Sequence, residues 1–559
     1  MSAVLPVLST RLSAAATAAF GTSYDPELRS ATKPEFGHFQ SNLALRIGNA
    51  LGKPPREIAA QLVAALDIDD LCRPPEIAGP GFINLTLLPQ TLAKAVNEPE
   101  TFGSNGQRVV VDYSQPNVAK QMHVGHLRST VIGDALCNVL RFVGYDVVRQ
   151  NHVGDWGTQY GMMIEQLLDE GITAESLDLE GLQRLYERSR KHFDADGTFA
   201  DRSRLRVVAL QSGDPETRAI WRHMVDVSLD DFDKVYALLG SALTRQDVYG
   251  ESAYNDDLPH VVDDLLKQGL LVESEGAMCA FLPGYLGRDG EPLPVIVRKS
   301  DGGFGYSATD LAAVRHRVNT LHADRIVYVV DHRQALHFDM IVTLARTAHW
   351  LDVPAEHVSF GTVLGPNGKP FKTREGGTIK LVELLTGAVD RADALLAGRE
   401  GINREATARA VGIGAVKYAD LSSDRGNDYV FDLDRMVAMT GNTGPYLQYA
   451  HARLTRLLAK AGQDATEVTE LEDPAEQRLA LLLTGFAATV EQVAETLQPH
   501  RLCTYLYDVA SALSVFYEQC PVLSSEGETR ASRIALCTAT RKVLQDGLGL
   551  LGIEAPDAM

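Results

Sequence analysis

The stretch of sequence that decides the fold is RVVVDYSQPNVAKQMHVGH, residues 108–126. It begins with a hydrophobic run, in which residues 109–111 predict a buried parallel strand. It ends on His123-Val-Gly-His126, at the start of an amphipathic segment. Helix positions i and i+3 share one face, and a helix N-terminus offers free N–H donors and a partial positive charge to an anion. This order of strand, loop and helix predicts a phosphate-binding site.

The two histidines also have a second interpretation. Both imidazoles can donate hydrogen bonds to phosphate oxygens, and Gly125 between them lets the backbone come close to a ligand. A histidine in such a position is also commonly a packing or capping residue. The four residues alone leave both interpretations open, and the strand before them and the helix after them favour the phosphate site.

The sequence after the histidines continues the same pattern. An apolar helical stripe is followed by Gly144, a natural helix stop, and by a second strand-like run at 146–149; the stripe comprises Leu127, Val131, Ala135, Val139 and Val143. The motif thus lies beyond the carboxyl end of the first strand, where open α/β sheets bind ligands. We predict a doubly wound parallel sheet of Rossmann type, with strands at 108–113, 146–151, 295–299, 325–331 and 358–364.

The chain of 559 residues is too long for a single core, and we predict three domains. Residues 1–104 predict an N-terminal α+β domain, with a helical stripe from Leu5 to Phe20 and a Gly79-Pro-Gly loop that enters a strand. Residues 105–385 predict the α/β domain, with a polar helical insertion at about 165–270. Residues 386–559 show almost no strand pattern and predict an α-helical bundle.

Cysteine spacing, hydropathy and charge limit the classes of function that the chain can have. The six cysteines are scattered without a Cys-x-x-Cys pair, which argues against a zinc site and a disulfide framework and fits a cytoplasmic protein. No apolar run reaches the roughly 18 residues that a membrane helix needs. The formal net charge of −20, taken alone, argues against a polyanionic partner. Nucleic-acid binding depends on local patches, so a basic face on an acidic protein stays open.

A second glycine-rich segment, residues 365–377, follows the last predicted strand. It carries Lys369, Lys372 and Arg374 in a loop with free backbone amides. Such a loop can move onto a triphosphate and neutralise the charge that develops on the leaving pyrophosphate. The alternative is a solvated basic hairpin. Together with the histidines, the segment favours an enzyme that activates a carboxylate with ATP.

Four long segments carry a resemblance to a known family. They are SQPNVAKQMHVGHLRS (114–129), NHVGDWGTQY (151–160), SDGGFGYSATD (300–310) and GPYLQYAHAR (444–453). In this order they resemble the class I arginyl-tRNA synthetases, over essentially the full length of the chain. One departure is the second ATP signature, commonly Lys-Met-Ser-Lys-Ser. Residues 369–373 keep both lysines but lose the middle, and a frame shifted by one loses the first lysine.

The resemblance implies arginine–tRNA ligase activity in two steps, arginyl-adenylate formation and transfer to the terminal ribose of tRNA(Arg). It implies that tRNA is often needed before arginine is activated. The residues implied at the ATP site are Lys120, His123, Gly125, His126, Lys369, Lys372 and Arg374. Those implied around arginine are Ser114, Asn117, His126, Tyr306, Asp310 and Gln334. A guanidinium forms paired hydrogen bonds with a carboxylate that an ammonium cannot reproduce.

The resemblance also implies contacts with tRNA. The N-terminal domain would read the tRNA elbow through Phe82 and Asn84, an aromatic and an amide suited to an unstacked base. The helical bundle would bind the anticodon arm through Tyr446, Tyr449 and Arg453. We expect an acidic back and a basic tRNA face. ATP is expected to bind together with Mg²⁺, and no carboxylate cluster in the sequence indicates that the protein itself holds this ion. Zinc is not expected. The chain is expected to be a monomer.

Several of these residues have structural alternatives. Ser307-Ala-Thr-Asp310 also matches a capping box, in which the acid caps a helix that starts there. Tyr306 and Gln334 are by default packing or surface residues. Phe82 fits a buried strand and Asn84 fits a turn.

Three other protein classes share part of the pattern. A small-molecule nucleotidyltransferase shares the His-x-Gly-His motif but needs neither a front domain of about 100 residues nor a helical tail. A non-catalytic RNA-binding relative should lack the histidines, and both are present. A cysteinyl synthetase should show zinc-ligand cysteines, which this spacing does not offer.

Overall fold

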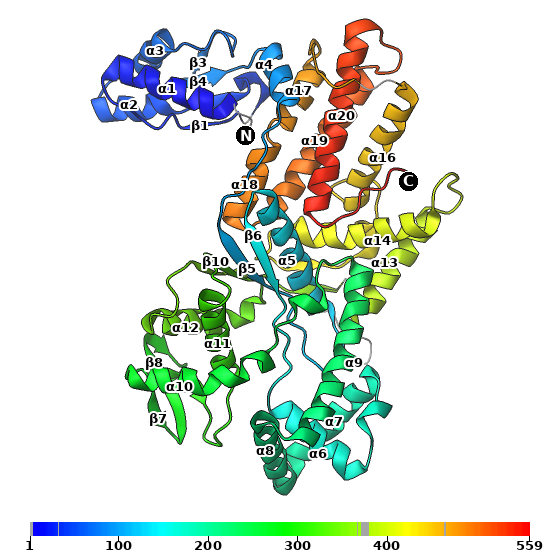
Figure 1. Cartoon of the computed structure of the whole chain (residues 1–559). Helices are drawn as coiled ribbons and strands as arrows, with labels where there is room; N and C mark the ends of the chain where they lie inside the picture. Colours follow the sequence, from blue (N-terminus) through cyan, green and yellow to red (C-terminus); the bar gives the residue numbers. More distant parts are fainter. Residues whose placement is uncertain (1–3, 32, 366, 370–378, 463–464) are drawn as a thin grey trace.

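The structure is a computed structural model that describes residues 4–31, 33–365, 367–369, 379–462 and 465–559. Figure 1 shows the N-terminal domain and the helical bundle side by side at the top, with the parallel sheet below them. Lys372 and Arg374 lie outside the described residues. No described helix is long and apolar enough to cross a membrane.

The N-terminal domain combines helices with a small antiparallel sheet. Its strands follow the order β1 (Leu28–Ser30), β2 (Phe39–Ser41), β4 (Phe82–Leu85) and β3 (Glu76–Ala78). Its helices are α1 (Val4–Phe20), α2 (Leu43–Leu51), α3 (Pro55–Ala65) and α4 (Pro89–Asn97). Leu8, Leu12 and Ala16 of α1 are fully buried, which confirms the predicted stripe. The Gly79-Pro-Gly loop enters β4 as predicted.

The central sheet is parallel throughout and carries helices on both faces. Its order is β11 (Ala355–His357), β10 (Arg325–Tyr328), β5 (Arg108–Asp112) and β6 (Asp146–Gln150). Val109 and Val111 of β5 share one core with α5 (Val124–Phe142). Val110 shares another with α11 (Tyr306–Asn319) and α12 (Ala335–Thr347). The alternation arises because successive strand side chains point to opposite faces.

For two of the predicted strands, the prediction that they belong to this sheet was wrong. The run at 295–299 belongs to β9 (Pro292–Arg298), which pairs antiparallel in a separate sheet with β8 (Ala277–Leu286), itself beside β7 (Val272–Ser274). In the segment 358–364 only β12 (Val363–Leu364) is a strand, and it pairs with β13 (Tyr429–Val430). Short apolar runs show where a strand forms but not which strand it will pair with.

The insertion after β6 is helical, as predicted. Its helices are α6 (Thr158–Glu170), α7 (Leu179–Ala195), α8 (Gly197–Ser212), α9 (Pro215–Leu239) and α10 (Leu258–Lys267). Figure 1 shows α9 rising from α6–α8 toward α13 and α14. Asp214 caps α9, because its side chain accepts from the Thr217 N–H.

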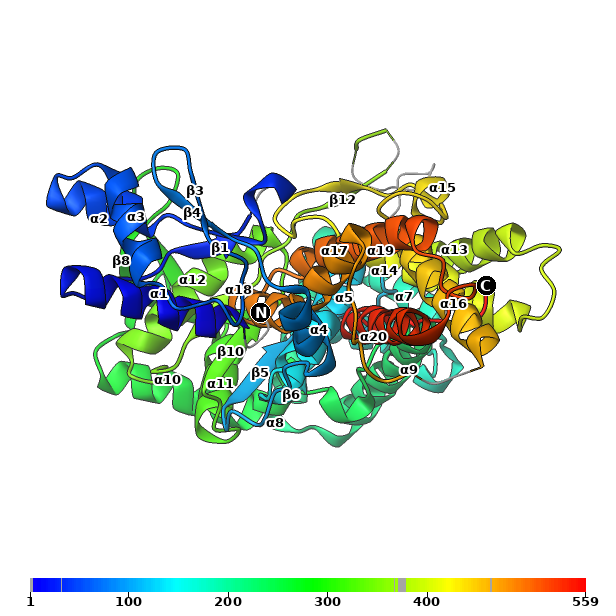
Figure 2. The same cartoon turned by 90° about the horizontal axis from the view of Figure 1, so that it is seen from above.

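The C-terminal part is a helical bundle, as predicted. Its helices are α13 (Leu381–Leu395), α14 (Arg404–Leu421), the short α15 (Leu433–Met436), α16 (Gly444–Ala461), α17 (Pro474–Leu483), α18 (Phe486–Thr496), α19 (His500–Gln519) and α20 (Gly527–Leu550). Seen from above, α20 runs beside α16 and α19 and over α5 (Figure 2).

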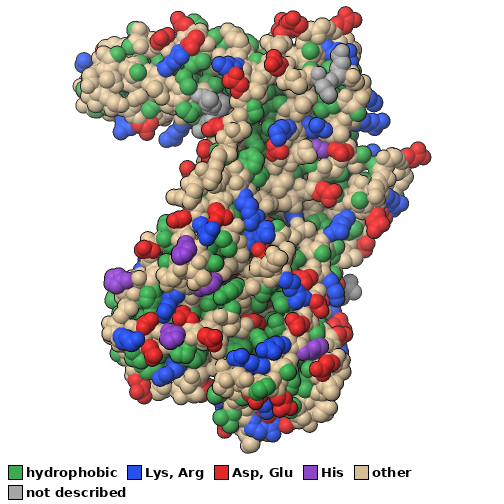
Figure 3. Space-filling view, in the orientation of Figure 1, with side chains coloured by type: hydrophobic (Ala, Val, Ile, Leu, Met, Phe, Trp, Pro, Cys, Tyr) green, Lys and Arg blue, Asp and Glu red, His purple; other side chains and the backbone are tan. Residues whose placement is uncertain are grey.

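The three parts are joined by specific contacts. The Asn97 side chain both donates to and accepts from the backbone of Val468, which ties α4 to the bundle. The Phe142 ring, at the end of α5, lies 5.8 Å from Phe102 and 5.9 Å from Phe486, centroid to centroid. A band of hydrophobic side chains is visible between the N-terminal domain and the bundle in Figure 3.

Candidate active site

His123 and His126 form a pair of imidazoles at the start of α5, just past the carboxyl edge of the sheet. Nδ1 of His123, the N-cap residue, accepts from the Gly125 N–H at 3.0 Å. Nδ1 of His126 accepts from the His123 N–H at 3.0 Å, and the two ring centroids are 4.1 Å apart. Because each Nδ1 is an acceptor, each ring carries its proton on Nε2 when neutral. The capping interpretation is therefore correct, yet both rings keep an Nε2–H donor for a ligand.

The imidazole pair is neutral in the free protein at pH 7. Burial, and then the neighbouring His123, lower the pKa of His126 to about 3. Burial, and then the charges of Arg333 and Lys120, also lower the pKa of His123. Gly125 serves this geometry directly, since a Cβ at that position would lie 2.8 Å from Cε1 of His123. The glycine leaves room for the imidazole.

The signature loop, residues 113–123, leads from β5 to the imidazole pair and ends at His123. Ser114, Gln115 and Ala119 all have positive φ, which costs conformational energy in residues with a Cβ. Ser114 is buried, and its hydroxyl is bonded to those of Tyr236 (2.7 Å) and Thr130 (2.9 Å). The Ser114 hydroxyl is therefore already engaged inside the protein.

Asn117, by contrast, is exposed on the signature loop. Asn117 forms a single β-bridge with Gly154. The residues on either side of Asn117, Pro116 and Val118, both form backbone hydrogen bonds with Gly154. A Cβ on Gly154 would lie 2.5 Å from Oδ1 of Asn117. The segment 151–160 thus holds the asparagine in place while its side chain stays accessible.

Tyr306 and Asp310 lie together at the start of α11. The helix begins at Tyr306 after the N-cap Gly305, so Asp310 lies one turn inside it and the capping interpretation of Asp310 was wrong. Oδ2 of Asp310 is 2.6 Å from Nε2 of His337 on α12, and the Tyr306 ring is 5.0 Å from the His337 ring. Gln334 is exposed at the N-terminus of the same α12.

Three further residues surround Asp310 that sequence reasoning missed. Besides His337, Nε2 of His152 lies 3.7 Å from Oδ1 of Asp310. Glu251 lies within electrostatic reach, and burial, then the carboxylates of Asp310 and Asp155, raise its pKa to about 8. His152 belongs to the segment 151–160, and the resemblance of that segment was a signal that could have identified it. Glu251 has no sequence signal, because it is one acid in a polar stretch.

Lys380 and Leu381, which follow the second glycine-rich segment in the sequence, lie beside the signature loop. His123 forms a β-bridge with Lys380, and the Leu381 N–H donates to the Met122 carbonyl at 2.9 Å. These two contacts hold the start of α13 against the end of the signature loop. Lys369 is exposed, and Lys120 is exposed with Nζ 4.5 Å from the centre of the Tyr186 ring.

The N-terminal residues assigned to tRNA lie on one strand. Phe82 and Asn84 of β4 share the face opposite the buried Ile83 and Leu85. Phe82 is partly exposed. Asn84 is a buried strand residue, not a turn, and its Oδ1 accepts from Gln40 Nε2 at 2.8 Å.

The bundle residues divide into two groups. Tyr446 packs inward, its hydroxyl 3.2 Å from that of Ser514 on α19. Tyr449 and Arg453, one turn apart on α16, are exposed, and the Arg453 guanidinium lies 3.5 Å from the Tyr517 ring centre. On the face shown in Figure 3, basic and acidic side chains are intermixed.

No three His, Cys, Asp or Glu side chains of the described residues are grouped so that they could hold a metal ion. All six cysteines are buried, and burial raises the pKa of each thiol, for example to about 12 at Cys137.

Comparison with known proteins gives a consistent result. A family model described as "tRNA synthetases class I (R), catalytic domain" matches residues 88–433. "Arginyl tRNA synthetase N terminal domain" matches residues 7–87, and "DALR anticodon binding domain" matches residues 447–559.

Individual relatives match over nearly the whole chain. An arginine--tRNA ligase of Cutibacterium acnes is 54% identical over 99% of this chain and 100% of its own. One of Thermobifida fusca is 49% identical over 99% of each. The crystal structure of arginyl-tRNA synthetase from Plasmodium falciparum superposes with a TM-score of 0.85, at 28% identity over 100% of both chains. Because the catalytic model spans more than half of the chain and these relatives cover almost all of it, the chain belongs to the class I arginyl-tRNA synthetases, the arginine--tRNA ligases.

Proposed function

We propose that the imidazole pair activates ATP for attack by the carboxylate of arginine. The observation that carries this is that two Nε2–H donors, a helix N-terminus and the acidic cluster around Asp310 all lie at one edge of the sheet. His126 and His123 donate to phosphate oxygens as charge develops. Lys120, Lys369, Lys372 and Arg374 neutralise the leaving pyrophosphate.

The two steps of the reaction need no covalent enzyme intermediate. An oxygen of the arginine carboxylate attacks the α-phosphorus of ATP, and the bond to pyrophosphate breaks. A hydroxyl of the terminal ribose of tRNA then attacks the arginyl carbonyl carbon, and AMP leaves. Because positioning and charge stabilisation supply most of the rate, the chain's contribution is the geometry of its donors.

The arginine side chain occupies the pocket formed by Tyr306, Asp310, Gln334 and Glu251 in this proposal. Two carboxyl groups suit a planar guanidinium, which can donate to both through separate N–H groups. A site built on such pairs rejects an analogue that lacks them by roughly 10⁴-fold or more. Asn117 binds the α-amino and carboxyl end, and Ser114 acts through the shape of the signature loop.

Arginine affinity is expected to rise with pH between about 6 and 8, because Glu251 must lose its proton to pair with the cationic guanidinium. Its pKa of about 8 leaves it neutral in the free protein at pH 7. Binding therefore releases a proton, and KM for arginine should fall by up to about tenfold per pH unit and level off above pH 8. KM measured across this range checks the effect.

Glu251→Gln is the matched control, since it keeps the shape but cannot ionise. Its KM for arginine should be raised and independent of pH. A wild-type KM that stays flat from pH 6 to 8 contradicts the role of Glu251.

The domain assignment forms part of the same proposal. Residues 1–104 contact the tRNA elbow, residues 105–385 catalyse both steps, and residues 386–559 bind the stem and the anticodon arm. Phe82 is accessible enough to stack on a base, whereas Asn84 and Tyr446 support the shape of their surfaces. Tyr449 and Arg453 are the bundle residues that a tRNA can reach.

Arg453→Ala is expected to raise KM for tRNA about three- to tenfold and to reduce its salt dependence, because a phosphate contact releases counterions. KM for arginine and ATP should not change. Charging assays between 50 and 200 mM salt test this, with Lys267→Ala on α10 as the control. Equal salt slopes for wild type and Arg453→Ala would count against this face.

Other parts of the proposal concern metal, assembly and location. Mg²⁺ enters bound to ATP, as part of the substrate. The proposal assigns no zinc, and the raised thiol pKa values support this because zinc ligands are thiolates. The chain acts as a monomer in the cytoplasm.

Charging of total tRNA with each of the twenty amino acids tests the proposed function as a whole. Arginine alone should be incorporated, in an ATP-dependent reaction. Charging with another amino acid would contradict the assignment of the pocket. ATP consumption on a small acid without any tRNA charging would favour a nucleotidyltransferase.

A further inference from the structure

Helix α9 of the insertion holds the signature loop near its start and at its middle. The Tyr236 hydroxyl bonds to Ser114 Oγ at 2.7 Å and accepts from Asn151 Nδ2 at 2.9 Å. Two turns earlier on the same face, Ser228 Oγ accepts from the Ala119 N–H at 2.9 Å. Ser114 and Ala119 are both residues with positive φ. Contacts with α9 therefore fall at two of the three loop residues that have positive φ.

The strained loop is connected onward to the imidazole pair. The Ser114 hydroxyl is bonded to that of Thr130, and Thr130 Oγ1 donates to the His126 carbonyl at 2.8 Å. Tyr236, Ser114 and Thr130 are all buried. A shift of α9 along its axis would thus displace the backbone of both the loop and the first turn of α5.

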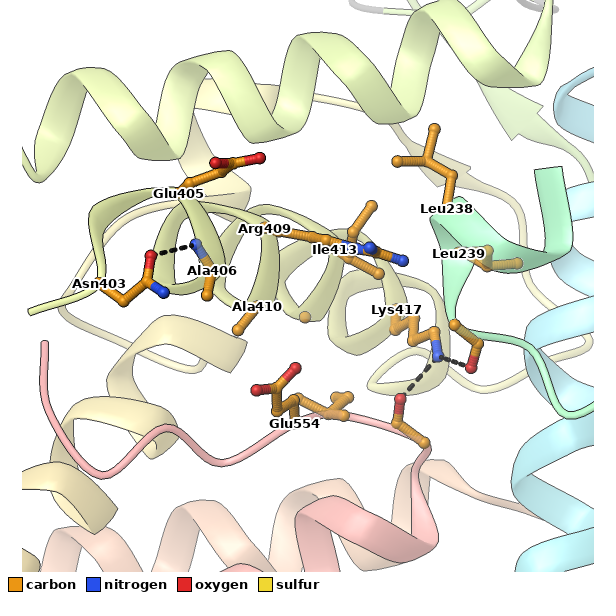
Figure 4. A pocket seen from close by; sticks show the side chains of 14 residues that line it. Leu238, Leu239, Asn403, Glu405, Ala406, Arg409, Ala410, Ile413, Lys417 and Glu554 are labelled. Carbon is orange, nitrogen blue, oxygen red and sulfur yellow. Dashed lines mark hydrogen bonds between the residues drawn. The ribbon is translucent and has the colours of Figure 1, made fainter. Parts of the chain in front are cut away.

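The carboxyl end of α9 is attached to the helical bundle. Lys417 of α14 is 2% exposed, and its Nζ donates to the Gly240 carbonyl at 3.2 Å and to the Gly552 carbonyl at 2.6 Å. Arg409, two turns earlier on α14, donates to the Ala237 carbonyl. Figure 4 shows Lys417 between the end of α9 and the C-terminal tail. Cations suit this place, since a helix C-terminus carries partial negative charge.

The contacts of Lys417 and Arg409 with the end of α9 are made beside a cavity. A cavity of about 460 Å³ lies between Leu238–Gly240, α14 and residues 552–554. Gln448 of α16 donates to the carbonyls of Ala410 and Glu554, which fixes α14 and the tail to the bundle. On the side of the cavity, two cationic side chains, Lys417 and Arg409, connect the end of α9 to α14.

We propose that Lys417 is a positioning residue that couples the helical bundle to the signature loop through α9 and Tyr236. The proposal rests on the assignment of the imidazole pair to ATP activation and of the bundle to tRNA. A bundle held by tRNA fixes α14, α14 fixes the end of α9, and α9 fixes Ser114 and Ala119. Lys417 acts on the rate of activation and touches no substrate.

A double-mutant cycle in the full-length protein tests this coupling. Lys417→Met keeps the length of the side chain and removes its charge, and Tyr236→Phe removes only the hydroxyl. Each is expected to lower kcat of arginine-dependent ATP–pyrophosphate exchange in the presence of tRNA by about tenfold. KM for arginine should stay within about twofold.

The double variant should be about as slow as the slower single variant, since both break one connection. The matched control is Tyr418→Phe, the next residue of α14, whose hydroxyl bonds to Asn442 and Cys503 inside the bundle. It should keep kcat near wild type. Arg409→Ala provides a milder break at the same joint should Lys417→Met fail to fold.

Two results would overturn the proposal. One is multiplication of the two single effects, to about 100-fold, which marks independent sites. The other is an equal loss of kcat in Tyr418→Phe, which marks a general loosening of α14. A wild-type protein that exchanges pyrophosphate with no amino acid would instead overturn the proposed function, so the two failures are distinguishable.

Discussion

Replacing His126 with alanine is expected to lower kcat for arginine-dependent ATP–pyrophosphate exchange by about 10²- to 10³-fold. The variant removes an Nε2–H donor whose orientation is fixed by the bond from the His123 N–H to Nδ1. That donor is neutral at pH 7 and needs no reorganisation when charge develops on the phosphates. Initial rates of ATP–pyrophosphate exchange, measured at saturating ATP and arginine, test the effect.

Matched variants separate catalysis from folding. His126→Gln keeps both an acceptor and a donor and should recover part of the lost rate. His260→Ala, on the exposed face of α10, should leave kcat unchanged. If kcat for pyrophosphate exchange in His126→Ala stays within a factor of three of wild type, the imidazole pair only caps the helix and has no role in catalysis.

Replacing Asp310 with asparagine is expected to reduce kcat/KM for arginine by about 10²- to 10³-fold, because a partly buried charge pair with the guanidinium is lost. Asp310 is 18% exposed at its side chain and is oriented by His337 at 2.6 Å, so the loss includes little solvent screening. KM for ATP should remain close to wild type. Steady-state exchange with arginine and ATP varied separately checks both values.

The control for Asp310 is another acid of the same domain. Asp301→Asn, in the exposed loop before α11, should leave kcat/KM unchanged. Equal losses for arginine and ATP in Asp310→Asn would indicate a displaced helix α11 in place of a lost guanidinium partner.

Much of the fold could be predicted from local patterns. The strand at 108–112, the helix after His123 and the capping of α9 at Asp214 all follow from short-range chemistry: β-branched runs, apolar periodicity and side-chain caps. The place of β9 outside the parallel sheet could not be predicted, because a short apolar run does not show which strand it will pair with. The same holds for β12, whose partner β13 lies more than 60 residues later in the sequence.

The candidate site divides in the same way. His123, His126 and Asp310 stand in motifs that the sequence displays. Their chemical state is decided elsewhere: burial lowers the pKa of His126, and His337 and Glu251, from distant segments, lie around Asp310.

The sequence by itself determined the family, the class of reaction and the residues that carry donors and charge, because these depend on residue type and short spacing. Only the tertiary structure decided which donors are free. It engaged the Ser114 hydroxyl with Tyr236 and left Asn117 accessible, and it placed Lys417 between α9 and the C-terminal tail. The reason is physical: hydrogen-bond partners, burial and electrostatic environment come from segments that are remote in the chain and meet only when it folds.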